Sequence, residues 1–137
     1  MGKVLVTSSH FETLCQEAKQ MLIAAGHEPV VYQGELPYMS FEEIAEVIGD
    51  IDGAIVGLDD WTDAVFEIAT KLKAVAKFGV GTDNIDKESA TRHGIKVLNA
   101  PGINSNAVAE LTVGLIIDML RGVTNLHMAM TKGEWVR

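Results

Sequence analysis

Short runs of apolar residues alternate along the chain with longer stretches in which apolar residues recur every three or four positions. The short runs are rich in Val, Ile, Leu and Ala, as buried β-strands are. The longer stretches have helical spacing, and one begins with Ser40 and Glu43 in a capping-box arrangement. The pattern predicts strands at 3–7, 28–32, 53–57, 72–78 and 95–98, and helices at 12–25, 40–48, 62–69 and 86–92.

This alternation of strands and helices predicts an α/β fold. Each predicted strand is apolar along its whole length, so both of its faces are expected to be covered. A parallel sheet with right-handed helical crossovers on both faces meets this requirement. We therefore expect residues 1–103 to form a flavodoxin-like or Rossmann-like domain built on a parallel five-stranded sheet.

The stretch from 104 to 130 has a different pattern. Apolar residues form one helical stripe and also occupy much of the remaining circumference. Asn104, Ser105 and Asn106 at its start are all suitable helix N-caps. A helix that is apolar on nearly every side has to be buried on several sides. We expect one long interdomain helix that lies between this domain and another body of protein.

Two glycine-rich turns stand out. Gly79 and Gly81 follow the fourth predicted strand and begin like a dinucleotide-binding fingerprint. The fingerprint is incomplete, because Asn84 occupies the third glycine position and no acidic residue ends the next strand. The turn either presents its backbone amides to an anion or is simply a tight turn, and spacing alone leaves both interpretations open.

The second turn, Pro101-Gly102, follows the fifth predicted strand, and Asn104 opens a helix whose first amides attract negative charge. Both turns are expected at the carboxyl-terminal edge of the sheet, where open α/β sheets bind ligands. The amides of Val80 and Gly81 are expected to point outward because Gly79 and Gly81 both adopt backbone angles that other residues resist. A small carboxylate or phosphate is expected to bind weakly where the turns meet.

Composition narrows the choice of partners. A formal net charge of -8 disfavours nucleic acid. No apolar run reaches the length of a membrane span, no signal peptide is visible, and the single Cys15 fits a reducing cytoplasm. The histidines lack metal-site spacing, so no metal is expected. Asp59-Asp60 fits a phosphorylatable receiver domain, but the first strand is not followed by the acids that such a domain requires.

Three segments together resemble the D-isomer-specific 2-hydroxyacid dehydrogenases. They are 72–86, read as LKAVA followed by FGVGTDNID, then GIKVLNAPG at 94–102 and NSNAVAELT at 104–112. The resemblance is strong from 69 to 121 and weaker before it. It implies that 1–103 is a flavodoxin-like substrate-binding domain, that 104–130 is the interdomain helix, and that 131–137 begins the linker to a nucleotide-binding domain.

The resemblance also implies roles for individual residues. The backbone amides of Val80 and Gly81 would hold the substrate carboxylate, and Asn104 would lie beside the reacting carbon. Thr112 would face the nicotinamide of NAD from the interdomain helix. The family's full dinucleotide fingerprint and its catalytic Arg, Glu and His lie beyond the equivalent of residue 137. No catalytic residue is therefore expected in this chain, and the chain alone is expected to be inactive.

Two hypotheses for function follow. In the first, the chain is the substrate-binding portion of a cytoplasmic, homodimeric enzyme that transfers hydride between a small anionic 2-hydroxy acid and NAD. In the second, it is a stand-alone flavodoxin-like module that binds an anion or an interaction partner without redox chemistry. A Gly-x-Gly-x-x-Gly segment soon after residue 137 in the coding sequence would favour the first hypothesis.

Overall fold

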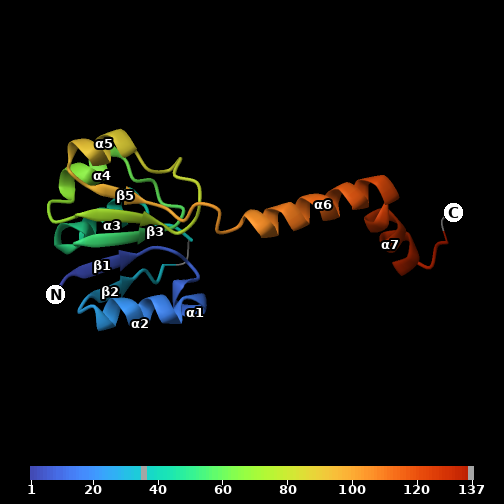
Figure 1. The fold of residues 1–137 in the computed structure, drawn as a ribbon, viewed down its shortest axis with the longest axis horizontal. Coiled ribbons are helices and arrows are strands. Elements are labelled where there is room, and N and C mark those ends of the chain that lie inside the picture. The colour runs from blue at the N-terminus through green and yellow to red at the C-terminus, as the bar shows by residue number, and fades with distance from the viewer. Residues whose placement is uncertain (35–36, 136–137) are drawn as a thin grey trace. The chain divides into compact units, whose positions relative to one another are not determined.

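The computed structural model describes residues 1–34 and 37–135, which form two compact units. The sheet unit comprises Met1–Pro101 and the helical unit comprises Gly102–Arg137. The sheet unit holds five parallel strands in the order β2-β1-β3-β4-β5 (Figure 1). The strands are β1 (Lys3–Val6), β2 (Glu28–Val31), β3 (Gly53–Val56), β4 (Ala74–Lys77) and β5 (Lys96–Leu98). The expected flavodoxin-like α/β fold is confirmed, with slightly shorter strands than predicted.

The core of the sheet unit lies mainly on one face of the sheet. Leu5, Ala54 and Val75 are register neighbours on β1, β3 and β4, and all three are buried in one hydrophobic cluster. Val30 and Val97 extend this row to the outer strands. Neighbouring residues of a strand face opposite sides of the sheet, so each strand contributes one central residue to this row. That residue is apolar in all five strands because the row faces the core.

Helices cover both faces of the sheet. The helix α4 contacts both α3 and α5, and α5 also contacts β5. The helix α2 contacts β2 at the other end of the strand order (Figure 1). The helices of the sheet unit are α1 (Phe11–Leu14), α2 (Gln16–Ala24), α3 (Phe41–Val47), the 3-10 turn η1 (Ile48–Asp50), α4 (Asp63–Ile68) and α5 (Lys87–Arg92). The first predicted helix is therefore divided, because the backbone of Cys15 (φ -118°, ψ 40°) leaves the helical range.

The predicted capping box at the start of α3 is present. The Ser40 hydroxyl accepts a hydrogen bond from the Glu43 amide (3.3 Å), and the Glu43 carboxylate accepts one from the Ser40 amide (2.8 Å). The Tyr32 hydroxyl donates to the same carboxylate (2.8 Å). The Ser40 amide and then the Tyr32 hydroxyl lower the pKa of Glu43. These contacts join the segment after β2 to the start of α3.

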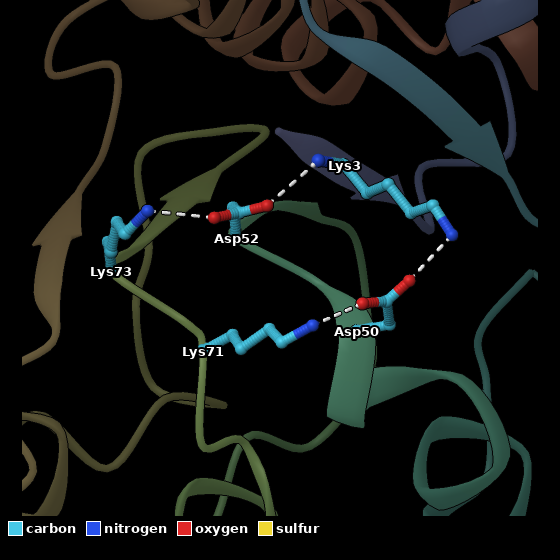
Figure 2. A network of polar contacts seen from close by, with 5 residues as sticks. All are labelled: Lys3, Asp50, Asp52, Lys71 and Lys73. Carbon is cyan, nitrogen blue, oxygen red and sulfur yellow. Dashed lines mark hydrogen bonds and ion pairs between the residues drawn. The ribbon is translucent and has the colours of Figure 1, made fainter. Parts of the chain in front are cut away.

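A network of lysines and aspartates lies at the amino-terminal edge of the sheet (Figure 2). Lys3 and Lys71 both donate to the Asp50 carboxylate, at 2.6 and 2.5 Å. The Lys3 amide (3.0 Å) and the Lys73 ammonium (2.8 Å) donate to Asp52. Hydrogen bonds from Lys3 and then Lys71 lower the pKa of Asp50 from 3.8 to about 2. The network connects the starts of β1, β3 and β4.

Asp50→Asn is expected to reduce stability at neutral pH but to have little effect near pH 2. The pKa of Asp50 is lower in the folded state than its ordinary value of 3.8, so its contribution is complete above about pH 4 and is lost as the pH falls towards 2. The effect should be small because these ion pairs are exposed. Urea unfolding of both proteins from about pH 6 to about pH 2 measures it. A stability difference that does not shrink at low pH would contradict this assignment.

The helical unit contains two helices where the sequence predicted one. These are α6 (Ser105–Arg121) and α7 (Val123–Thr131). Gly122 lies between them in the left-handed conformation (φ 62°, ψ 33°), which suits glycine and ends a helix. The side chain of Asp118 then accepts from the Thr124 amide (2.6 Å) and hydroxyl (2.9 Å) at the start of α7. The prediction of one continuous helix over 104–130 was therefore wrong.

The expected apolar character of α6 is present in the structure. Packing within the helical unit is limited to contact between α6 and α7, and it leaves α6 with no buried side chain. Within 1–34 and 37–135, no helix is both long and apolar enough to cross a membrane. The last two residues of the expected linker, 136–137, lie outside the described residues.

Candidate functional site

The turn after β4 is held to the end of β5 by hydrogen bonds that its carbonyls accept. The Gly79 carbonyl accepts from the Ala100 amide (2.9 Å), and the Val80 carbonyl accepts from the Asn99 side chain (2.7 Å). Within the described part of the chain, the amides of Val80 and Gly81 donate to no protein acceptor. The turn therefore has its carbonyls tied to the end of β5 while two neighbouring amides remain available to a ligand.

The two glycines of this turn have different roles. Gly79 has φ 149°, a conformation that side chains resist, so this position requires glycine. Gly81 does not have a positive φ, and a Cβ built on it would lie 3.4 Å from the Asp83 carboxylate, an ordinary contact. The expectation that both glycines need special backbone angles is correct for Gly79 and wrong for Gly81.

Asn84, which replaces the third glycine of the fingerprint, joins the loops after β3 and β4. Its amide nitrogen donates to the carbonyls of Gly57 (3.2 Å) and Asp59, and its oxygen accepts from the Lys77 ammonium (2.8 Å). Its backbone carbonyl accepts from the Trp61 amide (2.8 Å). The asparagine side chain at this position therefore joins the two loops through hydrogen bonds that glycine, which has no side chain, could not make.

Asp59 is a buried carboxylate that holds three of the loops together. The residue is 1% exposed, and its carboxylate accepts from the Met39 amide (2.6 Å) and from the Thr7 hydroxyl. The Thr7 oxygen in turn accepts from the Gly57 amide (3.0 Å). The segments after β1, β2 and β3 therefore meet at one group. Sequence reasoning considered Asp59 only as a phosphorylation site, a role that its burial opposes.

A small pocket lies next to the Gly79 turn. It has a volume of about 200 Å³, and its lining includes Ser8, Ser9 and His10 after β1, Leu58 after β3, and Lys77 with Phe78 at the end of β4. The Lys77 ammonium also donates to the Gly57 carbonyl (2.5 Å). Sequence reasoning did not identify Lys77, because a single lysine at the end of a strand carries no motif.

The other predicted site residues belong to the helical unit. Asn104 precedes α6 and its side chain makes no capping hydrogen bond, although its carbonyl accepts from the Val108 amide (3.0 Å). The Thr112 hydroxyl donates to the Val108 carbonyl (2.7 Å) one turn earlier in α6. Val80 and Gly81 are in the sheet unit, so the meeting of the two turns at one ligand stays a prediction. Within 1–34 and 37–135, no group of His, Cys, Asp and Glu could hold a metal ion.

Residues 4–134 match the model of the D-isomer specific 2-hydroxyacid dehydrogenase catalytic domain. The chain belongs to this family. The D-3-phosphoglycerate dehydrogenase of Methanocaldococcus jannaschii is 40% identical over 138 residues, which is 100% of this chain and 25% of that protein. The hydroxypyruvate reductase of Thermotoga maritima is 31% identical over 90% of this chain and 40% of its own length.

The fold comparison agrees with this assignment. The crystal structure of NAD+-bound 3-phosphoglycerate dehydrogenase from Entamoeba histolytica matches with a TM-score of 0.75 at 34% identity. That match covers 85% of this chain and 38% of the other chain. The chain therefore spans about a quarter to two fifths of the length of these family members. The resemblance to the family stated from the sequence motifs is confirmed, and proteins named D-3-phosphoglycerate dehydrogenase are among the similar relatives.

Proposed function

We propose that this chain is the substrate-binding part of an NAD-dependent D-2-hydroxyacid dehydrogenase. The two unused amides of Val80 and Gly81 support this most directly, because they form a cradle for a carboxylate at the edge where parallel sheets bind ligands. Family membership supplies the reaction class, and the names of the similar proteins point to small 2-hydroxy and 2-oxo acids. In this proposal Asn104 lies beside the reacting carbon and Thr112 faces the nicotinamide.

In the proposed reaction, the hydride on C2 of the hydroxy acid passes to the nicotinamide of NAD and the hydroxyl proton passes to a base. NAD supplies the hydride acceptor when bound. The contribution of the sheet unit is to fix the substrate carboxylate, which orients C2, and positioning of this kind accounts for a large part of enzymatic rate enhancement. The resemblance places the family's acid-base residues beyond the equivalent of residue 137, so the chain alone is expected to be inactive.

Two further expectations remain predictions. The apolar circumference of α6 favours assembly with a second copy, because large apolar side chains on one helix stabilise association when they are buried. The expected assembly is a homodimer. A cytoplasmic location is consistent with the single cysteine, Cys15.

An NMR titration of the chain with D-glycerate tests the proposal. The amide signals of Val80 and Gly81 should shift with a dissociation constant in the millimolar range or weaker, since the net charge of -8 opposes anions. Gly81→Val should abolish these shifts and leave the remaining spectrum folded, because the added side chain blocks the approach of a ligand to the backbone. Shifts confined to positions far from 79–82 would overturn the proposal.

A further inference from the structure

The loops at the carboxyl-terminal edge of the sheet unit carry acids and no Lys or Arg. These loops are 7–10, 32–40, 57–62, 78–86 and 99–101, which follow the five strands in turn. Among their described residues are Asp59, Asp60, Asp83 and Asp86. The chain has no Lys or Arg anywhere from 20 to 70, a stretch that includes two of these loops. By contrast, Lys3, Lys71 and Lys73 gather at the opposite edge (Figure 2).

Lys77, the last residue of β4, supplies a positive charge to the pocket beside the Gly79 turn. Two of the three N–H donors of its ammonium are already used by the Gly57 carbonyl (2.5 Å) and the Asn84 side chain (2.8 Å). One donor remains for a ligand. That donor, with the hydroxyls of Ser8 and Ser9 in the pocket lining, suits a hydroxyl or a single carboxylate oxygen.

A phosphate group needs a different environment. It carries close to two negative charges and three strong acceptor oxygens, and proteins recognise it with Arg or Lys side chains that are free to donate. At this edge it would meet the Asp83 carboxylate beside Gly81 and one lysine, Lys77, whose donors are mostly occupied.

Building on the proposed function, we infer that the substrate is a small 2-hydroxy acid without a phosphate group. Its carboxylate binds the amides of Val80 and Gly81, and its uncharged remainder occupies the pocket beside Lys77. This separates the chain from those similar proteins whose names specify phosphoglycerate. The loops at this edge carry no Lys or Arg that could neutralise a phosphate, and the Asp83 carboxylate beside Gly81 would repel it, because like charges brought together at a binding site are strongly unfavourable.

The experiment compares D-glycerate with D-3-phosphoglycerate, which differ by the phosphate alone. Both are titrated into the chain at matched ionic strength while the amide signals of 79–82 are followed by NMR. D-glycerate should bind about tenfold or more tightly than D-3-phosphoglycerate.

A gain-of-function variant makes the comparison sharper. Leu58 lines the pocket and its residue is 66% exposed, so Leu58→Arg adds a phosphate-binding group with little effect on packing. Met21, on α2, is also 66% exposed and is outside the pocket lining, so Met21→Arg adds the same charge elsewhere. Leu58→Arg should raise the affinity for D-3-phosphoglycerate relative to D-glycerate, and Met21→Arg should leave that ratio unchanged.

The possible outcomes separate this inference from the proposed function. If D-3-phosphoglycerate binds at 79–82 as tightly as D-glycerate, the inference is wrong while the proposed function stands. An equal rise in the affinity for D-3-phosphoglycerate relative to D-glycerate in both arginine variants would also overturn the inference, because the effect would then come from the net charge of the chain. If neither ligand shifts the signals of 79–82, the proposed function itself fails.

Discussion

Asp59→Ala should lower the free energy of unfolding by roughly 3 kcal/mol. The substitution removes the acceptor for the Met39 amide and the Thr7 hydroxyl, and both residues are buried. A buried donor left without a partner costs about 1–3 kcal/mol, and two donors are affected. Urea unfolding followed by tryptophan fluorescence is a suitable measurement, because Trp61 is fully buried two residues away.

The neighbouring Asp60→Ala is the matched control for this substitution. Asp60 is exposed, and its side chain accepts no hydrogen bond from any residue in 1–34 or 37–135. Its replacement should change stability by less than about 0.5 kcal/mol. Equal effects of the two substitutions would show that the buried hydrogen bonds of Asp59 do not hold the loops together.

Gly79→Ala should destabilise the sheet unit by about 1–3 kcal/mol, because the native φ of 149° is one that a residue with a Cβ rarely adopts. The cost comes from the backbone conformation and not from crowding, because the nearest atom to an added Cβ would be 3.9 Å away. The strain would either remain in the turn or force the amides of Val80 and Gly81 out of position. Displacement of these amides would lower the affinity for D-glycerate, which the NMR titration measures.

Gly81→Ala provides the comparison for Gly79→Ala. The backbone of Gly81 does not have a positive φ, and its added Cβ would make only an ordinary contact with Asp83. This variant should keep nearly all of the stability, as measured by urea unfolding of the two variants side by side. If Gly81→Ala proves the more destabilising of the two, the assigned backbone conformations of the turn are incorrect.

The sequence predicted the sheet well because burial in the core leaves a direct record in the apolar residues of the strands. Leu5, Ala54 and Val75 are apolar for the same reason, namely their shared row in the core. The two helix breaks were harder to foresee. Cys15 carries no helix-ending signal, and Gly122 lies within an apolar stripe that continues on both sides of it. Local backbone conformation ended these helices although the hydrophobic pattern did not change.

The candidate site was predictable where it depends on motifs and unpredictable where it depends on distant contacts. Gly79 and the turn that follows it were found from glycine spacing. Asp59 and Asn84 were not, because their roles come from partners elsewhere in the chain, such as Thr7, which lies 52 positions from Asp59. Nothing near either residue in the sequence shows that it will be buried against those partners.

These long separations also affect how the candidate site forms during folding. The Asp59 carboxylate joins the Met39 amide, 20 positions away, and the Thr7 hydroxyl, 52 positions away. No short segment can bring these groups together, because each loop has to be closed before its hydrogen bond can form. The loops around the pocket are therefore expected to become ordered only when β1, β2 and β3 have already assembled. Protection of the Met39 amide from hydrogen exchange would accordingly reflect cooperative opening of the whole sheet rather than local fluctuation of one loop.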